Sequence, residues 1–446
     1  MNHIKTGLYL TFFLLTLSLI LHALPPTNAA TNTQTTTLNR DFMGMVIRDP
    51  WYDFGTHPNY PNKPNYIAQD QMGRILSEAG VRWVRLDFHI PVVPGIENEA
   101  AFVEQEIAKN DFFIKDVAPR YGFKVLALLN FSLIPTAPQQ LNEGPFNVPS
   151  AYGGGVNAYM DTWLTRALKI TDRYRGSIDA YEILNEHNRL PPNGDAIDPS
   201  IAARLHTKFY RFCKNINPTD QNHGCTEDTP IIIGGLHPRG TNDEEGEIEM
   251  TDVEYLRAIY TDASSFVTFE DSYGYYPTDG IGYHPYPEEI RLSPNNKLID
   301  RGAERMRREL EAVGDPCIPF WVTEVGYNVG FDFDGPKGSQ PPQTEAGQIS
   351  FLRDVYTSLA TRQICDGQSE VERVFWFKYE DFPPADGANA QRWGIVTIPF
   401  VEDTQCPGGA CYETNGTPNS RRATFLMYRE LAGLPVHHTF LPLSNR

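Results

Sequence analysis

Short strand-like runs alternate with helical patterns along nearly the whole chain, and this alternation restricts the fold more than any other feature of the sequence. The eight candidate strands are residues 42–47, 83–88, 124–129, 178–184, 230–234, 281–284, 320–323 and 374–377. A strand that is followed by a helix leads into a strand that runs parallel to the first. Eight such units predict an α/β fold of the (β/α)8 TIM-barrel class, and 446 residues suffice for such a barrel with long loops.

Helical patterns fill the gaps between these strands. Residues 67–79 keep one face apolar, and Gly80 ends the pattern directly before a strand. Residues 303–313 repeat this arrangement and end at Gly314. A last helix is expected over residues 421–431.

The termini and linkers suggest one exported domain. No linker divides residues 30–446, and the polar stretches at residues 239–249, 330–344 and 403–418 are expected to be loop insertions. Residues 1–29 read as a signal peptide, because a lysine precedes a short apolar run and small residues follow it. An uncleaved anchor stays open as an alternative. We therefore expect a secreted protein, extracellular or periplasmic, with no stable membrane insertion once the signal is cleaved.

An exported chain can oxidise its cysteines, and this one has six. The most local of the possible pairings joins Cys213 with Cys225, Cys317 with Cys365, and Cys406 with Cys411. Their spacing matches no metal site, and we expect neither a metal nor a cofactor.

Charge excludes one class of partner. The chain has 56 Asp and Glu residues against 38 Lys and Arg, which gives a net charge of -18. Such a protein repels polyanions at neutral pH, so nucleic acid and anionic membranes are not expected as partners.

Two carboxylates follow separate candidate strands. In the segment YEILNEHN, residues 181–188, an apolar run ends in Asn185-Glu186, and the run at residues 320–323 is followed by Glu324. A strand buried on both faces tolerates few charges. In a (β/α)8 barrel, however, all strand C-termini open into one mouth, where chemistry takes place. We therefore expect both carboxylates to face a shared pocket.

Further polar and aromatic residues follow or end the other candidate strands. They are Arg85 on the second strand, Asn130 after the third, His284 and Tyr286 at the sixth, and Trp376 on the eighth. Two carboxylates on roughly opposite strands fit glycosidic bond cleavage, which needs a proton donor on one side of the anomeric carbon and a nucleophile or base on the other.

Each of these residues also has an ordinary structural interpretation. A single strand-end glutamate is more often an ion-pair or capping group than a catalyst. Arg85 could neutralise Asp87, His284 could be a core histidine, and Trp376 could fill the barrel. The two carboxylates after strands of one barrel favour the catalytic interpretation.

This ordered set of strand ends resembles clan A of the glycoside hydrolases, a superfamily of retaining enzymes that includes the cellulase-like family five and the xylosidase-like family thirty-nine. Asn185-Glu186 resembles the strand-four pair of the clan, which implies that Glu186 is the acid/base and that Asn185 binds the sugar 2-hydroxyl. Glu324 resembles the strand-seven nucleophile in its Thr-Glu setting.

The remaining strand ends extend the resemblance to clan A. His284-Pro285-Tyr286 is similar to the strand-six motif whose tyrosine hydrogen-bonds the nucleophile. Arg85 and Trp376 match the strand-two arginine and the strand-eight tryptophan that floors the first sugar subsite. There are two departures: family five has a histidine where this chain has Asn130, and His187 replaces the usual proline after Asn-Glu. The first departure weakens the resemblance to family five and leaves family thirty-nine, or an unassigned relative, in front.

The resemblance implies a secreted retaining β-glycosidase that hydrolyses O-glycosidic bonds of oligo- or polysaccharides, of the β-xylosidase or endo-β-glycanase type. In such a double displacement, the two carboxyl groups lie about 5–5.5 Å apart. We expect Arg85 and Tyr286 to keep Glu324 ionised, and the apolar strand behind Glu186 to raise the pKa of that residue. The alternative is a secreted carbohydrate-binding barrel without catalytic activity.

Overall fold

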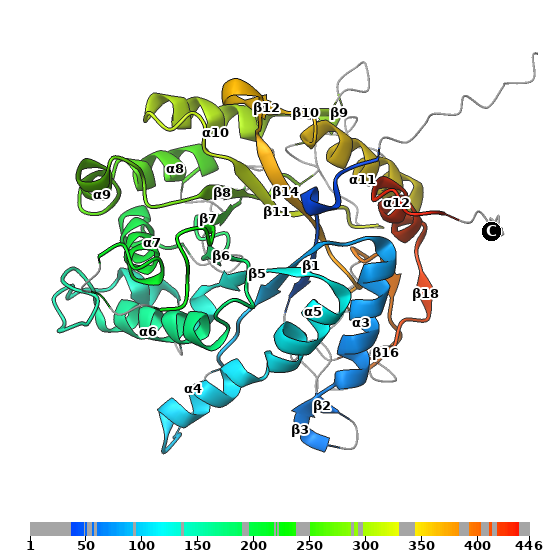
Figure 1. Ribbon diagram of the computed structural model, residues 1–446, viewed down its shortest axis with the longest axis horizontal. Helices are drawn as coiled ribbons and strands as arrows, with labels where there is room; N and C mark the ends of the chain where they lie inside the picture. Colours follow the sequence, from blue (N-terminus) through cyan, green and yellow to red (C-terminus); the bar gives the residue numbers. More distant parts are fainter. Residues whose placement is uncertain are drawn as a thin grey trace, which may run out of the picture. The chain divides into compact units, whose positions relative to one another are not determined.

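Eight parallel strands form a closed barrel in the computed structural model (Figure 1). In chain order they are β1 (Met43–Arg48), β4 (Trp83–Asp87), β5 (Lys124–Leu129), β6 (Ala180–Ile183), β7 (Ile231–Leu236), β8 (Gly280–Tyr283), β11 (Phe320–Gly326) and β14 (Val371–Phe377). Each strand pairs with the next, and β14 pairs with β1 to close the ring. The predicted fold class is confirmed, and every candidate strand overlaps one barrel strand.

The structure describes most of the chain beyond residue 36. The described residues are 37–48, 50, 56–57, 60–91, 95–134, 138–189, 196–217, 220, 223–237, 250–286, 290–292, 298–329, 344–382, 392–402, 410–412 and 417–436. The predicted signal peptide at residues 1–29 lies outside them, as do Cys406 and residues 239–249. All of the described residues belong to one compact unit.

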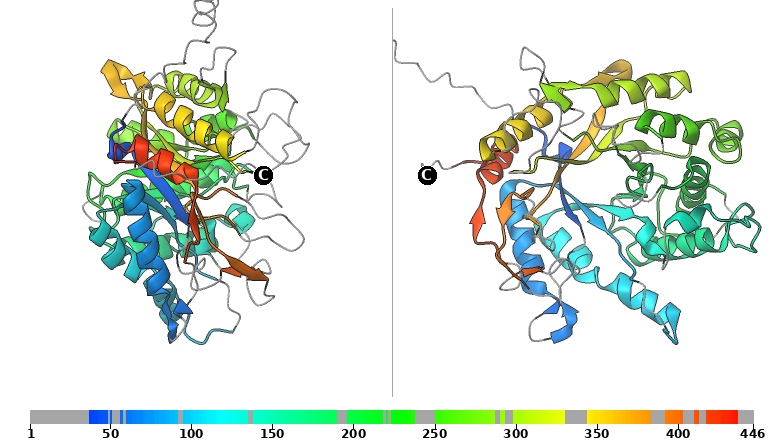
Figure 2. Two further views of the ribbon diagram at one scale, coloured as in Figure 1. Left: turned by 90° about the vertical axis from the view of Figure 1, so that its right-hand side faces the viewer. Right: turned by 180° about the vertical axis from the view of Figure 1, so that it is seen from behind.

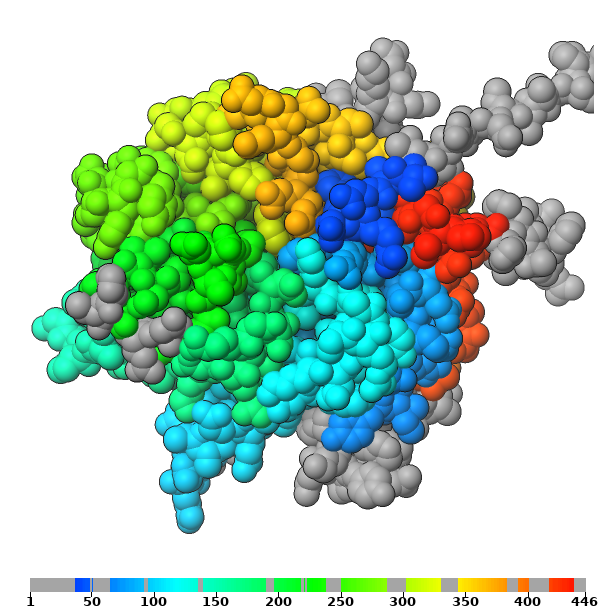
Figure 3. Space-filling model, in the orientation of Figure 1, coloured from blue at the N-terminus to red at the C-terminus, as the bar shows by residue number. Residues whose placement is uncertain are grey.

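Helices surround the barrel in chain order (Figure 1), so segments that follow one another in the sequence are neighbours at the surface (Figure 3). They are α3 (Tyr66–Ala79), α4 (Glu99–Ala108), α5 (Ala118–Tyr121), α6 (Ala158–Arg173), α7 (Pro199–Cys213), α8 (Asp252–Tyr260), α9 (Phe266–Tyr273), α10 (Arg301–Ala312), α11 (Glu345–Leu359) and α12 (Ala423–Leu431). The C-terminal helix α12 packs against both α11 and α3, which closes the helical layer (Figure 2). Among the described residues, no helix is long and apolar enough to cross a membrane.

Short strands and helical turns lie in the segments that connect the barrel strands and the main helices. Two-stranded antiparallel sheets pair β2 (Thr56–His57) with β3 (Tyr60–Pro64), β9 (Ile290–Leu292) with β10 (Leu298–Asp300), β12 (Gln363–Ile364) with β13 (Gln368–Ser369), β15 (Val396–Thr397) with β18 (Ser420–Arg421), and β16 (Phe400–Glu402) with β17 (Ala410–Tyr412). Short helical turns are η1 (Arg40–Phe42), η2 (Phe113–Val117), η3 (Phe131–Leu133), η4 (Pro138–Asn142) and η5 (Cys365–Gly367).

Local sequence signals explain where the helices begin and end. The Asn65 side chain accepts a hydrogen bond from the Ala68 amide and caps α3, and Gly80 ends this helix at a φ of 93°. The last helix begins at Ala423, two residues after the predicted start. It begins there because Ser420–Arg421 pairs with β15 instead of entering the helix.

Alternation along the strands separates two apolar clusters. One cluster fills the barrel and takes one residue from each of seven strands: Val46, Trp83, Leu126, Ala180, Ile232, Trp321 and Phe375. The remaining barrel strand, β8, contributes Gly280, where a Cβ atom would lie 3.0 Å from both Ile232 and Trp321. The larger cluster lies outside this one and includes the buried faces of the helices. Residues two positions further along each strand from the barrel cluster are therefore expected to point inward as well, one layer closer to the mouth.

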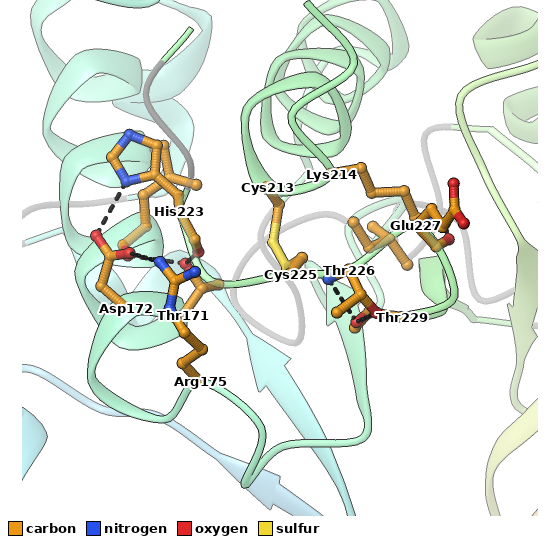
Figure 4. Close-up of a disulfide and its surroundings, with 12 residues drawn as sticks. Thr171, Asp172, Arg175, Cys213, Lys214, His223, Cys225, Thr226, Glu227 and Thr229 are labelled. Atoms are coloured by element: carbon orange, nitrogen blue, oxygen red, sulfur yellow. Dashed lines mark hydrogen bonds and ion pairs between the residues drawn. A yellow bond between two sulfur atoms is a disulfide. The ribbon is translucent and has the colours of Figure 1, made fainter. Parts of the chain in front are cut away.

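Two of the three predicted disulfides are present. Cys213 at the end of α7 bonds Cys225, which lies in the loop before β7 (Figure 4). The same loop is held on α6, because the His223 ring bonds Asp172 over 3.0 Å. Cys317, just before β11, bonds Cys365. The predicted Cys406–Cys411 bond lies outside the described residues.

The two disulfides close loops of different length, and this difference gives a prediction. Cys317 and Cys365 are 48 residues apart, whereas Cys213 and Cys225 are 12 apart. Because a longer closed loop removes more entropy from the unfolded chain, we expect the paired change Cys317→Ser/Cys365→Ser to lower the free energy of unfolding by about 4 kcal/mol, and the other pair by about 3 kcal/mol. Urea unfolding of both double variants measures which one loses more free energy of unfolding. A larger loss in the Cys213/Cys225 variant would contradict the loop-entropy explanation.

Candidate active site

The structure brings Glu186 and Glu324 together at the C-terminal end of the barrel. Glu324 lies in β11, and Glu186 comes three residues after the end of β6. One carboxylate oxygen of each, together with a ring nitrogen of His284, lies within 4.8 Å of the others. Two acidic groups that are 138 positions apart in the sequence therefore share one small space.

Cationic and hydroxyl donors hold Glu324. The Nη1 atom of Arg85 donates to its Oε1 over 2.6 Å, and the Tyr286 hydroxyl donates to its Oε2 over 2.7 Å. Both donors are the ones expected from the sequence. Burial raises the pKa of Tyr286 well above its ordinary value, and the adjacent carboxylate of Glu324 adds to the rise, so the phenol keeps its proton as a donor.

Glu186 has a different environment. Its Oε1 is 2.9 Å from Nδ1 of His284, and its Oε2 accepts from Arg189 over 3.1 Å. Its backbone amide donates to the carbonyl of Gly235 over 2.8 Å. Leu184 and Glu186 both have positive φ, at 67° and 43°. Such backbone is strained for these residue types, and it turns the chain out of β6 into the mouth.

The expected rise in the pKa of Glu186 is not found. Burial does act to raise this pKa, but the hydrogen bond from His284 and the positive charges of His237, His284 and Arg189 outweigh it, so that the pKa lies well below its usual range. The pKa of His284 moves the other way: burial lowers it, while Glu324 and Glu186 raise it above its ordinary value. These opposite shifts favour an ion pair between Glu186 and His284, with the shared proton on the histidine.

A third carboxylate, Glu182, was not predicted from the sequence. It lies on β6 two residues after Ala180 of the barrel cluster and is completely buried. Its oxygens accept from Nε and Nη2 of Arg85 over 2.5 and 3.1 Å. The signal in the sequence was a charged residue in the middle of a buried apolar strand, which requires a buried partner.

Arg85 connects these groups. Besides Glu182 and Glu324, it donates to Oδ1 of Asn185 over 2.7 Å. Asp87 affects Arg85 only through its charge, so the alternative in which Arg85 serves mainly to neutralise Asp87 does not describe the site.

Asn130 lies apart from this network. Its side chain accepts from the amide of Phe131 and caps the short helix η3, and its carbonyl accepts from the Trp163 indole. Asn130 is buried, with 6% of its surface exposed. The structure therefore places it in a structural contact at the end of β5, and a contact with substrate stays a prediction.

The expectation that Trp376 lines the mouth is wrong. Its neighbour Phe375 points into the barrel, and alternation along β14 directs Trp376 to the opposite side. There the indole is fully buried, with its ring centroid 6.3 Å from that of Phe351 on α11.

Other aromatic rings lie near Glu324 instead. Phe377 packs against the barrel cluster, and its ring is 5.5 Å from that of Trp393. Trp393 is in turn 5.7 Å from Tyr286, the donor to Glu324. Trp393 was not predicted, because it follows the last barrel strand by sixteen positions and no periodicity marks it.

The three groups Glu186, His284 and Glu324 have the types and spacing of metal ligands, but their surroundings do not fit a resident cation. Each of the four carboxylate oxygens already has a donor from the protein, and the donors include two arginines. A metal ion here would lie beside Arg85 and Arg189.

Comparisons with known proteins agree with the fold. No family model and no curated protein matches the chain. Among solved structures, the β-glucosidase from Thermotoga maritima in complex with castanospermine has a TM-score of 0.52 at 12% identity, with 90% of this chain and all of that chain covered. The virulence factor SghA in complex with its substrate analog salicin has a TM-score of 0.50 at 13% identity, with coverages of 90% and 97%.

A family 39 glycoside hydrolase from Bacteroides cellulosilyticus WH2 has a TM-score of 0.48 at 14% identity, and the match spans 89% of this chain but only 65% of that protein. At such identities, the matches with TM-scores of 0.50 and above show a shared architecture. The chain has the (β/α)8 barrel fold that the two proteins named first also have.

The buried arginine gives a prediction about stability. Replacing Arg85 by Met leaves Glu182 buried without its cation, so we expect the free energy of unfolding to fall by about 3–5 kcal/mol. The double variant Arg85→Met/Glu182→Met removes both charges and is expected to recover part of this loss. Urea unfolding compares the variants.

The exposed pair of Arg353 and Asp354 provides the control. Arg353→Met should change stability by less than about 1 kcal/mol, as is usual for surface pairs. A double variant no more stable than Arg85→Met alone would show that Glu182 does not depend on this cation.

Proposed function

We propose that the chain is a secreted retaining β-glycosidase that hydrolyses O-glycosidic bonds of an oligo- or polysaccharide by double displacement. The observation that carries the proposal is the approach of Glu186 and Glu324, whose nearest oxygens lie within 4.8 Å of each other. Retaining glycosidases hold their two carboxyl groups about 5–5.5 Å apart, whereas inverting enzymes leave room for a water molecule between substrate and base.

The different partners of the two carboxylates assign their roles. Glu324 is held by Arg85 and Tyr286, which favour the charged form needed for a nucleophile. Glu186 shares a proton with His284, which suits a group that must give and later accept a proton. In the first step, an oxygen of Glu324 bonds to the anomeric carbon while the bond from that carbon to the leaving oxygen breaks.

The shared proton moves during this step. As Glu324 forms its ester bond, it loses the negative charge that helps to hold the proton on His284. The proton then passes through Glu186 to the leaving oxygen. In the second step, water attacks the anomeric carbon, releases Glu324 and returns a proton to the Glu186–His284 pair, so the protons balance over the cycle.

Two further observations support the proposal. The T. maritima enzyme that shares the fold is named a β-glucosidase, which favours a saccharide substrate for this chain as well. Disulfides at two places indicate an oxidising compartment, as expected of a secreted protein. Within the enzyme class we keep the β-xylosidase or endo-β-glycanase type as the narrower proposal, on the resemblance to clan A.

The alternative of a carbohydrate-binding barrel without catalysis is less well supported. A barrel that only binds sugar has no need for a nucleophile with two donors or for an acid/base that shares a proton with a histidine. Binding of oligosaccharides without release of reducing sugar would favour it.

The roles of the two carboxylates can be tested together on an aryl β-glycoside. Glu324→Gln removes the nucleophile and should lower kcat on the order of a thousandfold. Glu186→Ala should recover turnover when azide is added, with a β-glycosyl azide as product, because azide needs no general base. Proton NMR of the first sugar released by the wild-type protein should show the β anomer.

Glu345→Gln is a matched control. Glu345 is the first residue of α11, and its carboxylate pairs with Arg422. The substitution should leave kcat unchanged. Substantial activity of Glu324→Gln, an unchanged rate for Glu186→Ala or release of the α anomer would each contradict the assignment.

The aromatic residues near Glu324 give a second prediction about the site. Trp393 is the partly exposed ring beside Tyr286, whereas Trp376 is buried behind the strand. Trp393→Ala should lower kcat/KM roughly tenfold, the effect of losing one stacking contact. Trp376→Leu should keep kcat/KM but lower the free energy of unfolding by about 2–4 kcal/mol, because it leaves a cavity. Loss of activity in Trp376→Leu but not in Trp393→Ala would instead place Trp376 at the mouth of the barrel.

A further inference from the structure

Glu182 has no part in the two displacement steps, yet it lies completely buried beside them. In addition to the two bonds from Arg85, its Oε1 accepts from the Gly235 amide and from the Thr323 hydroxyl, each over 2.9 Å. A carboxylate paired with an arginine in this way can only accept hydrogen bonds. The proton of the Thr323 hydroxyl therefore points to Glu182.

This direction decides the next bond in the chain. Oγ1 of Thr323 lies 3.0 Å from Nε2 of His284. Because its one proton is donated to Glu182, the hydroxyl oxygen can only accept from the ring. Nε2 of His284 must consequently carry hydrogen.

The other ring nitrogen, Nδ1, faces Glu186 over 2.9 Å. With hydrogen fixed on Nε2, two states satisfy every bond: a charged His284 beside an ionised Glu186, or a neutral His284 whose Nδ1 accepts from a protonated Glu186. Both states hold the shared proton. In the state without it, His284 would be neutral and would donate from Nδ1 to an ionised Glu186, so that its bare Nε2 would face the lone pairs of Thr323.

We propose that Glu182 is a positioning residue that, through Thr323, fixes hydrogen on Nε2 of His284 and so keeps the acid proton on the Glu186–His284 pair. Losing that proton requires Thr323 to turn its hydroxyl away from Glu182 and towards Nε2. The relay from Glu182 through Thr323 thereby raises the pH at which the pair gives up its proton.

Other charged and titratable groups also face this pair, and the test must leave them in place. They are Arg85 on β4, His187 and Arg189 after β6, His237 after β7, Tyr286 after β8, and Glu324 on β11. Thr323→Val changes none of these charges. It keeps the shape of the side chain and removes only the hydroxyl.

The first measurement does not depend on catalysis. In protein labelled with ¹⁵N-histidine, the ring signals of His284 can be assigned by their loss in His284→Asn. We expect Nε2 to be protonated in the wild type across neutral pH. In Thr323→Val we expect it to lose its proton at a pH about one unit lower, because a hydrogen on Nε2 would then have no acceptor.

The second measurement rests on the proposed function. The basic limb of kcat/KM against pH reports loss of the acid proton from the free enzyme. It should move about one unit to lower pH in Thr323→Val and return in Thr323→Ser, which restores the hydroxyl, while the acidic limb stays in place. Thr424→Val, a buried threonine on α12 that also loses one hydrogen bond, should show neither change.

The two measurements separate the two proposals. A folded Thr323→Val protein whose His284 signals titrate as in the wild type overturns the relay. If the nitrogen signals shift as expected and no glycoside is cleaved by the wild-type protein, the relay stands and the proposed function fails. Should Thr323→Val not fold, Thr323→Ala, which also lacks the hydroxyl, is compared with wild type by the same nitrogen signals, and unchanged signals again overturn the relay.

Discussion

The ion pair between Arg85 and two carboxylates is the interaction on which the site depends. One guanidinium inside the barrel bonds Glu182 and Glu324, and its shortest bond to each is 2.6 Å or less. A buried carboxylate without a cation is strongly destabilising, so Arg85, which bonds both, allows Glu182 and Glu324 to lie buried. The cost of burying these charges is offset within the cluster and does not depend on solvent.

The charges of the cluster also explain why a proton is retained. Within the ion pairs of the site, Arg85, Arg189 and a protonated His284 carry three positive charges, which match the three carboxylates Glu182, Glu186 and Glu324. Removing the shared proton leaves these paired groups with an excess of negative charge in a largely buried space. The same charge balance is kept when Glu324 is esterified. One negative charge then disappears from the paired groups, and one proton leaves them with the departing oxygen.

Much of the barrel and its site follows from the alternation of side chains between the two faces of a strand. The residues that the sequence did not predict are those to which this alternation was not applied or for which it does not hold. The eight strands could be predicted because each is a short apolar run before a helical pattern. Trp376 is misplaced by the sequence argument because it lies next to the last residue of its strand, although Phe375 and Phe377 share the inward phase and so direct Trp376 towards the helices. Glu182 is in the inward phase with Ala180 and could have been found by the same rule.

Glu186 and Trp393 lie outside any period. The backbone at Leu184 and Glu186 has left-handed φ, so the direction of Glu186 cannot be derived from alternation along β6. Trp393 reaches Tyr286 from a loop, where the path of the chain depends on contacts between elements distant in sequence. The resemblance to clan A pointed to Glu186 as a reactive residue, but it did not predict the ion pair with His284.

Gly235 shows how closely backbone and side chains are fitted at this point. Its amide donates to Glu182, and its carbonyl accepts from the amide of Glu186, so one residue of β7 joins the buried carboxylate to the one in the mouth. A Cβ atom at this position would lie 2.0 Å from Nε2 of His284 and 2.7 Å from Oγ1 of Thr323. Any side chain on residue 235 would therefore separate the histidine from the threonine. The contact that orients the imidazole exists only because β7 presents bare backbone to it.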